Sequence, residues 1–213
     1  AGARVQGSRP LDQSKVQAPC AVRVPDGGYR LFYTAIGPGK PYANCQGYIL
    51  SAYSRDGLQF ELEPGIRMAP EPEVPHMALR VLAPSVARTD DGRWRMYFEA
   101  RGTADRPAVI CSATSNDLLF WTREEGVRVQ EFDRVGGPRY VSLPDGRGRL
   151  YCCAAEVEHS GGASSRQQSV VSATTSDGLR FSIDDGYRLS GRQAEYDSAG
   201  ITAAEVLPPS NAD

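Results

Sequence analysis

The stretch APSVARTDDGRWRMYFEA (Ala83–Ala100), followed by VICSATSNDLLFW (Val109–Trp121), decides how this chain folds, because the chain contains it three times. The other two copies lie about 60 residues to either side. The first covers Ala18–Ala35 and Gly47–Phe60, and the third covers Gly137–Ala154 and Val170–Phe181. A regular repeat of this kind is the signature of solenoids and β-propellers.

Each copy has the pattern of short antiparallel strands. In the second copy the aromatic run Arg95–Glu99 follows Asp90-Asp91-Gly92, and an Asp-Gly step between apolar runs is a strong hairpin signal. A Ser-Ala segment and another Asp turn follow. This pattern predicts an all-β fold with four strands per copy and no helix, and four-stranded units repeated radially form a β-propeller. We expect the inner strands to cover about 18–24, 83–89 and 138–143.

The repeats divide one expected domain, residues 1–213, into segments of about 16–68, 81–129, 135–190 and 198–213. The fourth copy begins near Gly200 and reaches Pro208 shortly before the last residue, Asp213. Three blades in an open arc expose faces and edges that neighbouring blades normally cover. We therefore expect the propeller to be incomplete, with the remaining blades supplied by the rest of the polypeptide or by another chain.

Composition excludes two classes of partner. The 213 residues carry a formal net charge of −2, which argues against a nucleic-acid partner. Apolar runs are too short to span a membrane. We therefore expect a soluble protein whose compartment is open, with the cytoplasm slightly favoured. The five cysteines favour reduced, buried thiols over a disulfide framework, and Cys152 and Cys153 should face opposite sides of one strand.

The repeats resemble the five-bladed β-propellers of glycoside hydrolase families 43 and 32. The resemblance rests on the Pro step and Asp-Gly turn of each copy, which are Ala83-Pro84 with Asp91-Gly92, Gly137-Pro138 with Asp145-Gly146, and the later steps Asp56-Gly57 and Asp177-Gly178. It implies a five-bladed propeller, of which this chain supplies about three blades and the start of a fourth. It also implies a carbohydrate ligand in the central pocket.

The same resemblance places three carboxylates at the openings of the first three blades, where one protonates the leaving oxygen and another activates water. Those positions are Ala18, Ala83 and Gly136 here, and none of them can move a proton. Hydrolysis is therefore in question, and two functions stay open: a glycosidase-like enzyme with carboxylates elsewhere, and a non-catalytic module that binds an anionic or phosphorylated sugar. A phosphorylase-like enzyme similar to family 130, using phosphate held by Arg and Lys, is a further alternative.

Basic residues recur at one position of the repeat. Lys15, Arg80 and Arg134 each precede a valine at the opening of a copy, Asp197 takes the place in the fourth, and Arg139 lies just inside the third. Convergent cations of this kind bind phosphate, sulfate or carboxylate groups. The alternative is that each pairs with an acid on a neighbouring blade, such as Asp133 or Asp197.

Other candidate residues are single. His76 lies in a long Pro-rich insert that is placed to overhang a site. Glu99, Asp197 and Glu205 are weak candidates for a catalytic acid, and Glu99 has a structural alternative as a partner of Arg95 or Arg101. Glu156, Glu158 and His159 have no specific metal-binding spacing, and a solvated loop is the stronger interpretation. We expect no metal and no cofactor.

Overall fold

The structure, a computed structural model, describes residues 2–39, 42–155, 168–192 and 195–207. Its described residues are almost entirely strands and turns, with a single short 3-10 helix at Tyr42–Asn44. This confirms the prediction of an all-β fold. Short, largely buried apolar segments bounded by turn residues, together with the absence of helical periodicity in the sequence, account for this outcome.

The strands form three units of four, one for each copy of the repeat. The first unit contains β1 (Lys15–Arg23), β2 (Tyr29–Ile36), β3 (Gly47–Ser54) and β4 (Glu61–Leu62). The second contains β5 (Arg80–Arg88), β6 (Trp94–Arg101), β7 (Val109–Ser115) and β8 (Thr122–Arg123). The third contains β9 (Arg134–Ser142), β10 (Gly148–Ala155), β11 (Ser169–Thr175) and β12 (Ser182–Ile183). Within each unit, consecutive strands pair antiparallel.

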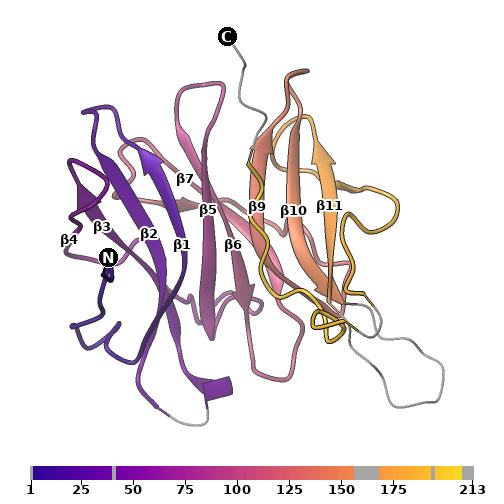
Figure 1. Ribbon diagram of the computed structural model, residues 1–213, viewed down its shortest axis with the longest axis horizontal. Helices are drawn as coiled ribbons and strands as arrows, with labels where there is room; N and C mark the ends of the chain where they lie inside the picture. Colours follow the sequence, from indigo (N-terminus) through magenta and orange to yellow (C-terminus); the bar gives the residue numbers. More distant parts are fainter. Residues whose placement is uncertain (1, 40–41, 156–167, 193–194, 208–213) are drawn as a thin grey trace.

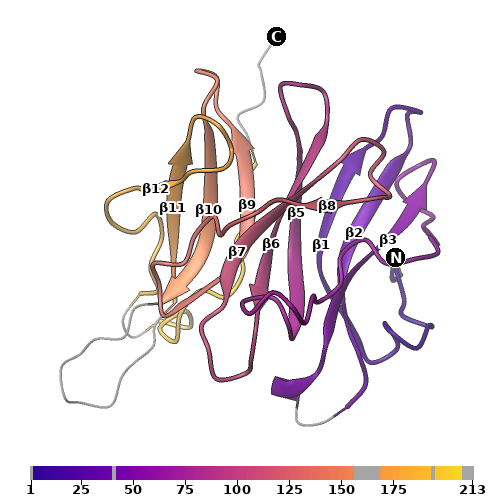
Figure 2. The ribbon, with the colours of Figure 1, turned by 180° about the vertical axis from the view of Figure 1, so that it is seen from behind.

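The three units stand side by side around a common centre (Figures 1 and 2), and the first strand of each lies against the first strand of the next. We call β1, β5 and β9 the inner strands, and the end where they begin, low in Figure 1, the bottom end. The inner strands begin about three residues earlier than the sequence predicted. One parallel bridge, Gly47 to Arg80, joins the first unit to the second, and a matching bridge, Gln168 to Gly200, follows the third.

Each inner strand carries a β-bulge at its Pro step. The ladder with the second strand shifts register there, and Ala18, Ala83 and Gly137 take left-handed backbone angles, with φ of 49°, 50° and 57°. Glycine adopts this conformation without strain, whereas alanine is sterically strained in it. Bulges of this kind re-aim side chains toward a site, so the bulge fixes where the openings of the blades point.

The Asp turns join neighbouring units. Asp117 accepts hydrogen bonds from the backbone N–H groups of Leu119 and Phe120, as Asp56 and Asp177 do in their own turns. Backbone carbonyl groups of these turns also accept hydrogen bonds from arginine side chains of the preceding unit. Arg67 donates to the Leu119 oxygen at 3.0 Å, and Arg128 donates to the Leu179 oxygen at 2.9 Å.

The outer face of the third unit lacks the cover that the other two units have. Met68, Val129 and Leu189 bridge to the third strand of their own units, and their exposed fractions are 5%, 1% and 57%. Arg188, the counterpart of Arg67 and Arg128, is likewise exposed. Because two units bury this face against a following unit and the third does not, the described residues leave one inter-unit surface uncovered.

Replacing Arg67 with methionine is expected to lower the free energy of unfolding by about 2 kcal/mol, because the buried guanidinium donates to Leu119 and to Ser51 Oγ. Urea denaturation of the full chain measures this change. Arg188→Met is the matched control, since among the residues that the structure describes Arg188 bonds carbonyl groups of its own turn, and it should change stability by less than about 0.5 kcal/mol. Equal effects of the two substitutions would contradict the role given to Arg67 between units.

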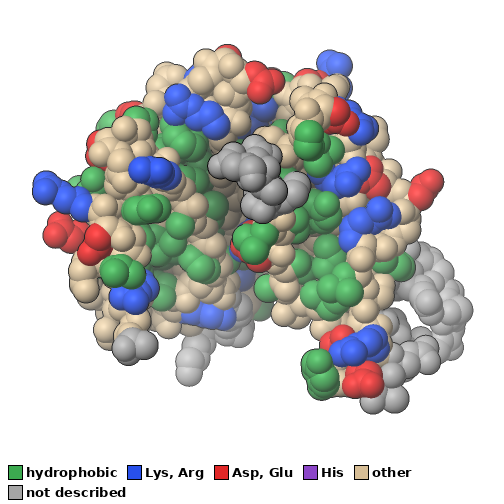
Figure 3. Space-filling model, turned by 45° about the horizontal axis from the view of Figure 1, so that its top comes forward, with side chains coloured by type: hydrophobic (Ala, Val, Ile, Leu, Met, Phe, Trp, Pro, Cys, Tyr) green, Lys and Arg blue, Asp and Glu red, His purple; other side chains and the backbone are tan. Residues whose placement is uncertain are grey.

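Other sequence expectations can be compared with the structure. No disulfide joins the five cysteines, and Cys152 and Cys153 are both buried on β10. In the described residues, no helix is long and apolar enough to cross a membrane. Seen with the top end forward, Lys and Arg side chains are interspersed with Asp and Glu (Figure 3).

Candidate functional site

The basic residues of the repeat lie where the inner strands begin. Lys15 and Arg134 are exposed at the starts of β1 and β9, and Arg80 is buried at the start of β5. Arg80 stands directly opposite Arg101 in the pairing of β5 with β6, and its Nη2 donates to the Ala43 carbonyl oxygen. Like charges facing each other across two strands are unfavourable unless an acid or a bound anion offsets them.

Glu99 supplies a negative charge beside these arginines. It lies on β6 opposite Leu82, is partly buried, and faces Arg101, Arg134 and Arg80. Burial raises the pKa of the Glu99 carboxyl, and the three guanidinium groups and the Gly137 N–H oppose this effect without cancelling it. The Glu99 carboxyl is therefore the acidic group of the basic cluster. Its surroundings favour the protonated form more than bulk water does.

The carboxyl of Glu99 rests against the backbone of β9. A Cβ atom added at Gly136 would lie 2.3 Å from Glu99 Oε2 and 3.0 Å from its Cδ. The backbone N–H of the next residue, Gly137, acts to lower the pKa of the same carboxyl. In the first unit the equivalent residue is Thr34, whose Oγ1 accepts a hydrogen bond of 2.7 Å from the Ala83 N–H. This position of the second strand therefore bridges to the bulge of the following unit in both cases.

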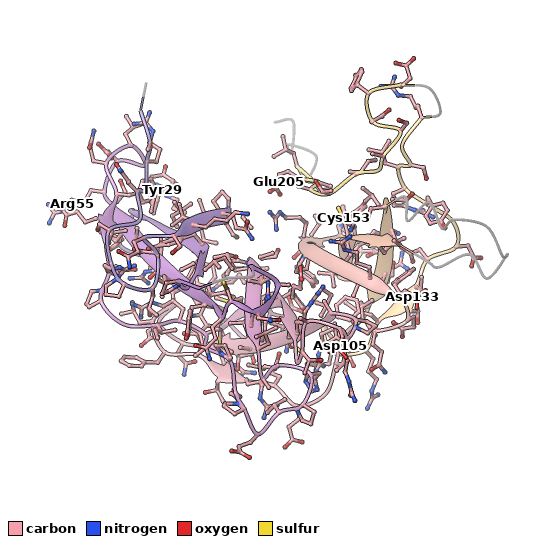
Figure 4. All side chains as sticks on the ribbon, turned by 90° about the horizontal axis from the view of Figure 1, so that it is seen from below. Tyr29, Arg55, Asp105, Asp133, Cys153 and Glu205 are labelled. Atoms are coloured by element: carbon pink, nitrogen blue, oxygen red, sulfur yellow. The ribbon has the colours of Figure 1, made fainter. Side chains whose placement is uncertain are left out.

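A pocket of about 390 Å³ opens next to this cluster at the bottom end. Its lining contains three arginines and two acids among Arg101, Ala104, Asp105, Arg106, Pro107, Asp133, Arg134 and Ala155. Figure 4, viewed from below, shows Asp105 and Asp133 close together on the side of the third unit. Within the described part of the chain, the buried Nε of Arg101 has no hydrogen-bond partner. The guanidinium groups of Arg101 and Arg134, both of which line the pocket, can donate hydrogen bonds to an anionic ligand.

Further along the inner strands, one position per unit faces the next unit. Cys20 Sγ accepts from the Val86 N–H at 3.3 Å, and Ser85 Oγ accepts from the Tyr140 N–H at 2.9 Å. Arg139 holds the same place in the third unit and forms an ion pair of 2.9 Å with Glu205. Burial raises the pKa of Cys20, and Arg139 and Glu205 both act on it electrostatically. Glu205 lies at the open side of the arc between the third unit and the first (Figure 4).

The structure brings some of the sequence candidates together and separates others. Ala18, Ala83 and Gly136 all lie at the bulges of the inner strands, and Ala83 packs against Ala18 in one small apolar cluster. Arg80, Arg134 and Glu99 converge, whereas Lys15 lies on the first unit. Arg139 and Glu205 neutralise each other further along the strands.

Two candidates lie away from the basic cluster. His76 is near the Arg123–Glu71 ion pair of the second unit's outer strand, and burial lowers the pKa of its imidazole. Asp197 lies in a turn and pairs with Arg192 at 3.2 Å. The bridge to Gln168 gives Gly200 the position of Arg80, so the repeat position assigned to Asp197 was off by three residues. Glu156, Glu158 and His159 lie outside the described residues.

Sequence reasoning named Arg101 as a possible partner of Glu99 and not as a ligand-binding residue, and it did not name Arg106. The signal for Arg101 was present, because a hairpin centred on Asp91-Gly92 places residue 101 opposite residue 80. Arg106 follows β6 in a connection whose length differs between copies, and no repeat position marks it. The link from Glu99 to Gly136 crosses a unit boundary, which pairing within a single repeat does not reveal.

No family model and no curated protein matches this chain. Solved structures do. A family 117 glycoside hydrolase from Zobellia galactanivorans aligns with a TM-score of 0.67 at 17% identity, over 90% of this chain and 63% of its own. A glycosyl hydrolase from Bacteroides ovatus aligns with a TM-score of 0.64 at 19% identity, over 86% and 54%.

The β-1,2-mannobiose phosphorylase of Listeria innocua, in complex with β-1,2-mannobiose, aligns with a TM-score of 0.62 at 14% identity, over 87% of this chain and 62% of its own. The chain has the fold of these carbohydrate-active enzymes. It spans about 54 to 63% of the length of these three structures. Likeness at such low identity establishes the fold, and the function has to be argued from the site.

Proposed function

We propose that this chain forms three blades and begins the fourth of a five-bladed, glycosidase-like propeller of the kind found in families 43 and 32. Its bottom end binds a carbohydrate that carries an anionic group. The uncovered face of the third unit is the surface on which the remaining blades pack, whether from the same polypeptide or from another chain. The proposed ligand site lies between the second and third units.

One observation carries this proposal: Arg80, Arg101 and Arg134 gather around one carboxyl, beside a pocket that Arg101 and Arg134 also line. With Arg106, Asp105 and Asp133 of the pocket lining included, four guanidinium groups stand beside three carboxyls, next to a space of about 390 Å³, which suits a small ligand. A phosphate, sulfate or carboxylate group accepts paired hydrogen bonds from guanidinium groups. Of the two acids named as alternative partners of the cations, Asp197 pairs with Arg192, whereas Asp133 lines the pocket beside Arg134.

Titration calorimetry tests the proposal with inorganic phosphate, sulfate, a uronic acid and a sugar phosphate, each against a neutral sugar of the same ring. The double variant Arg101→Gln, Arg134→Gln should weaken binding of the anionic probes more than tenfold, which corresponds to about 1.4 kcal/mol. Arg80 is kept, because it is buried and bonds the Ala43 carbonyl. Its loss would affect folding as well as binding.

Arg147→Gln is the matched control for this experiment. Arg147 is exposed, pairs with Asp145 at 2.7 Å in the turn between β9 and β10, and lies at the opposite end of the units. It should leave the affinity unchanged. Binding that is equal in the double variant and the control, or no binding of any anion by the unaltered chain, would refute the proposed site.

A second candidate function, cleavage of a glycosidic bond, is favoured by the partly buried Glu99 itself. A binding module needs only the arginines, whereas an enzyme needs a carboxyl that can hold a proton. Cleavage of an oligosaccharide with and without inorganic phosphate separates the two kinds of enzyme. A phosphorylase needs the phosphate, whereas a hydrolase uses water.

A further inference from the structure

We propose that Glu99 is the acid of this site, presented from β6 into the space that a side chain at position 136 of β9 would otherwise fill. This inference rests on the proposed function, because it gives a role to one residue of that carbohydrate site. The resemblance to families 43 and 32 places an acidic glutamate at position 136, and this chain has glycine there. The carboxyl would thus reach the same place from a different strand and a different unit.

The first argument is steric. The Cβ of any residue at position 136 would lie 2.3 Å from Glu99 Oε2, well inside van der Waals contact. The backbone angles at position 136 do not require a glycine, since the residue with the left-handed conformation in this bulge is Gly137. The Glu99 carboxyl thus occupies the space that a side chain at position 136 would enter. Because Oε2 and Cδ are the movable end of the Glu99 side chain, a side chain at position 136 would displace the carboxyl from this place.

The second argument compares equivalent positions. Thr34 makes the same bridge to the next unit with a hydroxyl group, at 2.7 Å from the Ala83 nitrogen. A hydroxyl therefore suffices for the structural task, and it avoids burying a charge. A glutamate at this position needs a further reason. Its three facing arginines come from β5, β6 and β9, and the buried thiols of Cys152 and Cys153 on β10 also feel its charge.

The third argument concerns protonation. Burial raises the pKa of Glu99 against the opposing effect of Arg101, Arg134 and Arg80. A carboxyl that keeps its proton closer to neutral pH is suited to general acid catalysis. Glu99 also remains partly exposed, and Arg101 and Arg134, which act on its carboxyl, line the adjoining pocket.

The step that follows is simple. The protonated carboxyl of Glu99 gives its proton to the glycosidic oxygen, and the bond between that oxygen and the anomeric carbon breaks with its electron pair on the oxygen. A water molecule forms the new bond to the anomeric carbon and releases a proton to the solvent. Glu99 is left ionised and regains a proton from the solvent.

Exchange of the carboxyl between the two strands tests the geometry independently of any ligand. Gly136→Glu alone should lower the unfolding temperature, because the new side chain displaces the Glu99 carboxyl and places a second carboxyl beside it. Glu99→Thr copies Thr34 and should fold. The double variant Glu99→Thr, Gly136→Glu should recover most of the loss, and the difference between the double and single variants measures the coupling. Additive effects would show that the two positions do not share one space.

Turnover tests the acid role, with oligosaccharides and 4-nitrophenyl glycosides as probes. Glu99→Gln keeps the shape of the side chain and should slow cleavage of oligosaccharides by about 10²- to 10⁴-fold. The 4-nitrophenyl substrates should be far less affected, since their leaving group needs no proton. The variant should also lose the fall in rate at high pH that ionisation of Glu99 gives the unaltered chain, whereas a purely structural residue would leave the pH profile in place.

Each result bears on one claim. Equal rates for the unaltered chain and Glu99→Gln on oligosaccharides, or no cleavage of any probe by the unaltered chain, would overturn the acid role. If the chain binds anionic sugars but cleaves none, the proposed binding function stands and only the acid role fails. If it binds no sugar and no anion, the proposed function fails, while the stability cycle still shows whether Glu99 occupies the space beside Gly136.

Discussion

Replacing Phe98 with alanine is expected to lower the free energy of unfolding by about 3–5 kcal/mol. Phe98 lies on β6 with an exposed fraction of 0%, inside the apolar cluster that joins the first unit to the second. This cluster includes Phe32 and Met77, and Phe32 also packs edge-on against Trp121. Truncation removes the buried ring and leaves a cavity, because a close-packed interior collapses only in part.

Chemical denaturation of the full chain, followed by tryptophan fluorescence, measures the loss. Phe120→Ala is the matched control, because Phe120 is 79% exposed and should change stability by less than about 0.5 kcal/mol. A loss for Phe98→Ala no larger than that of Phe120→Ala would mean that the first two units do not share a core.

The strands could be predicted because each copy repeats a local signal. An aromatic run after Asp91-Gly92 specifies a hairpin by turn geometry alone, and the recurring turn of Asp117 specifies the next. The three copies confirm one another, so errors in one are corrected by the others. Strand starts were less predictable: β5 begins at Arg80, because the ladder with β6 continues past the bulge at Ala83.

The site was harder to predict because its parts meet across a unit boundary. Glu99 and Gly136 are 37 positions apart, and nothing in the repeat indicates that the second strand of one unit touches the bulge of the next. The sequence suggested Arg101 as one possible partner of Glu99, and the structure adds Arg80 and Arg134. Comparison with Thr34, which bonds Ala83 in the first unit, reveals the contact as part of the architecture.

This arrangement describes the openings at which the resemblance led us to expect carboxylates. At Ala18 and Ala83 the bulge keeps its left-handed conformation although alanine is strained there, so the backbone geometry persists without an acidic side chain. Both alanines pack in an apolar cluster with Leu82. In the described residues, the first two openings are therefore apolar, and the ionisable chemistry is concentrated between the second and third units.

The N-terminal segment covers the first unit where a preceding unit would lie. Arg4 donates to the Leu58 carbonyl at 3.1 Å, as Arg67 donates to Leu119 for the second unit. Asp12 fixes this segment: it is 0% exposed and accepts hydrogen bonds from the Arg9 N–H at 2.7 Å and from the Tyr33 hydroxyl at 2.9 Å. The Arg9 guanidinium also pairs with it at 2.9 Å.

Asp12→Asn is expected to destabilise the chain by about 3 kcal/mol at neutral pH, because it leaves a partly buried guanidinium without its counter-charge. Burial acts to raise the pKa of Asp12, but the hydrogen bonds from Arg9 and Tyr33 outweigh it and hold the pKa below its ordinary value of 3.8. The unfolded chain therefore binds this proton more readily than the folded one. The stabilisation is complete well above pH 3.8 and is lost as the pH falls through the lowered folded value.

Urea midpoints of the unaltered chain and Asp12→Asn, measured from neutral pH downward, should consequently converge in acid. Asp91→Asn is the control, since Asp91 forms an exposed pair with Arg93 and should leave the neutral-pH midpoint unchanged. Hydrogen exchange should show the loss of protection concentrated in β2 and in the N-terminal segment. A difference between the two chains that stays constant from neutral pH into acid would show that the charge of Asp12 does not hold this segment on the first unit.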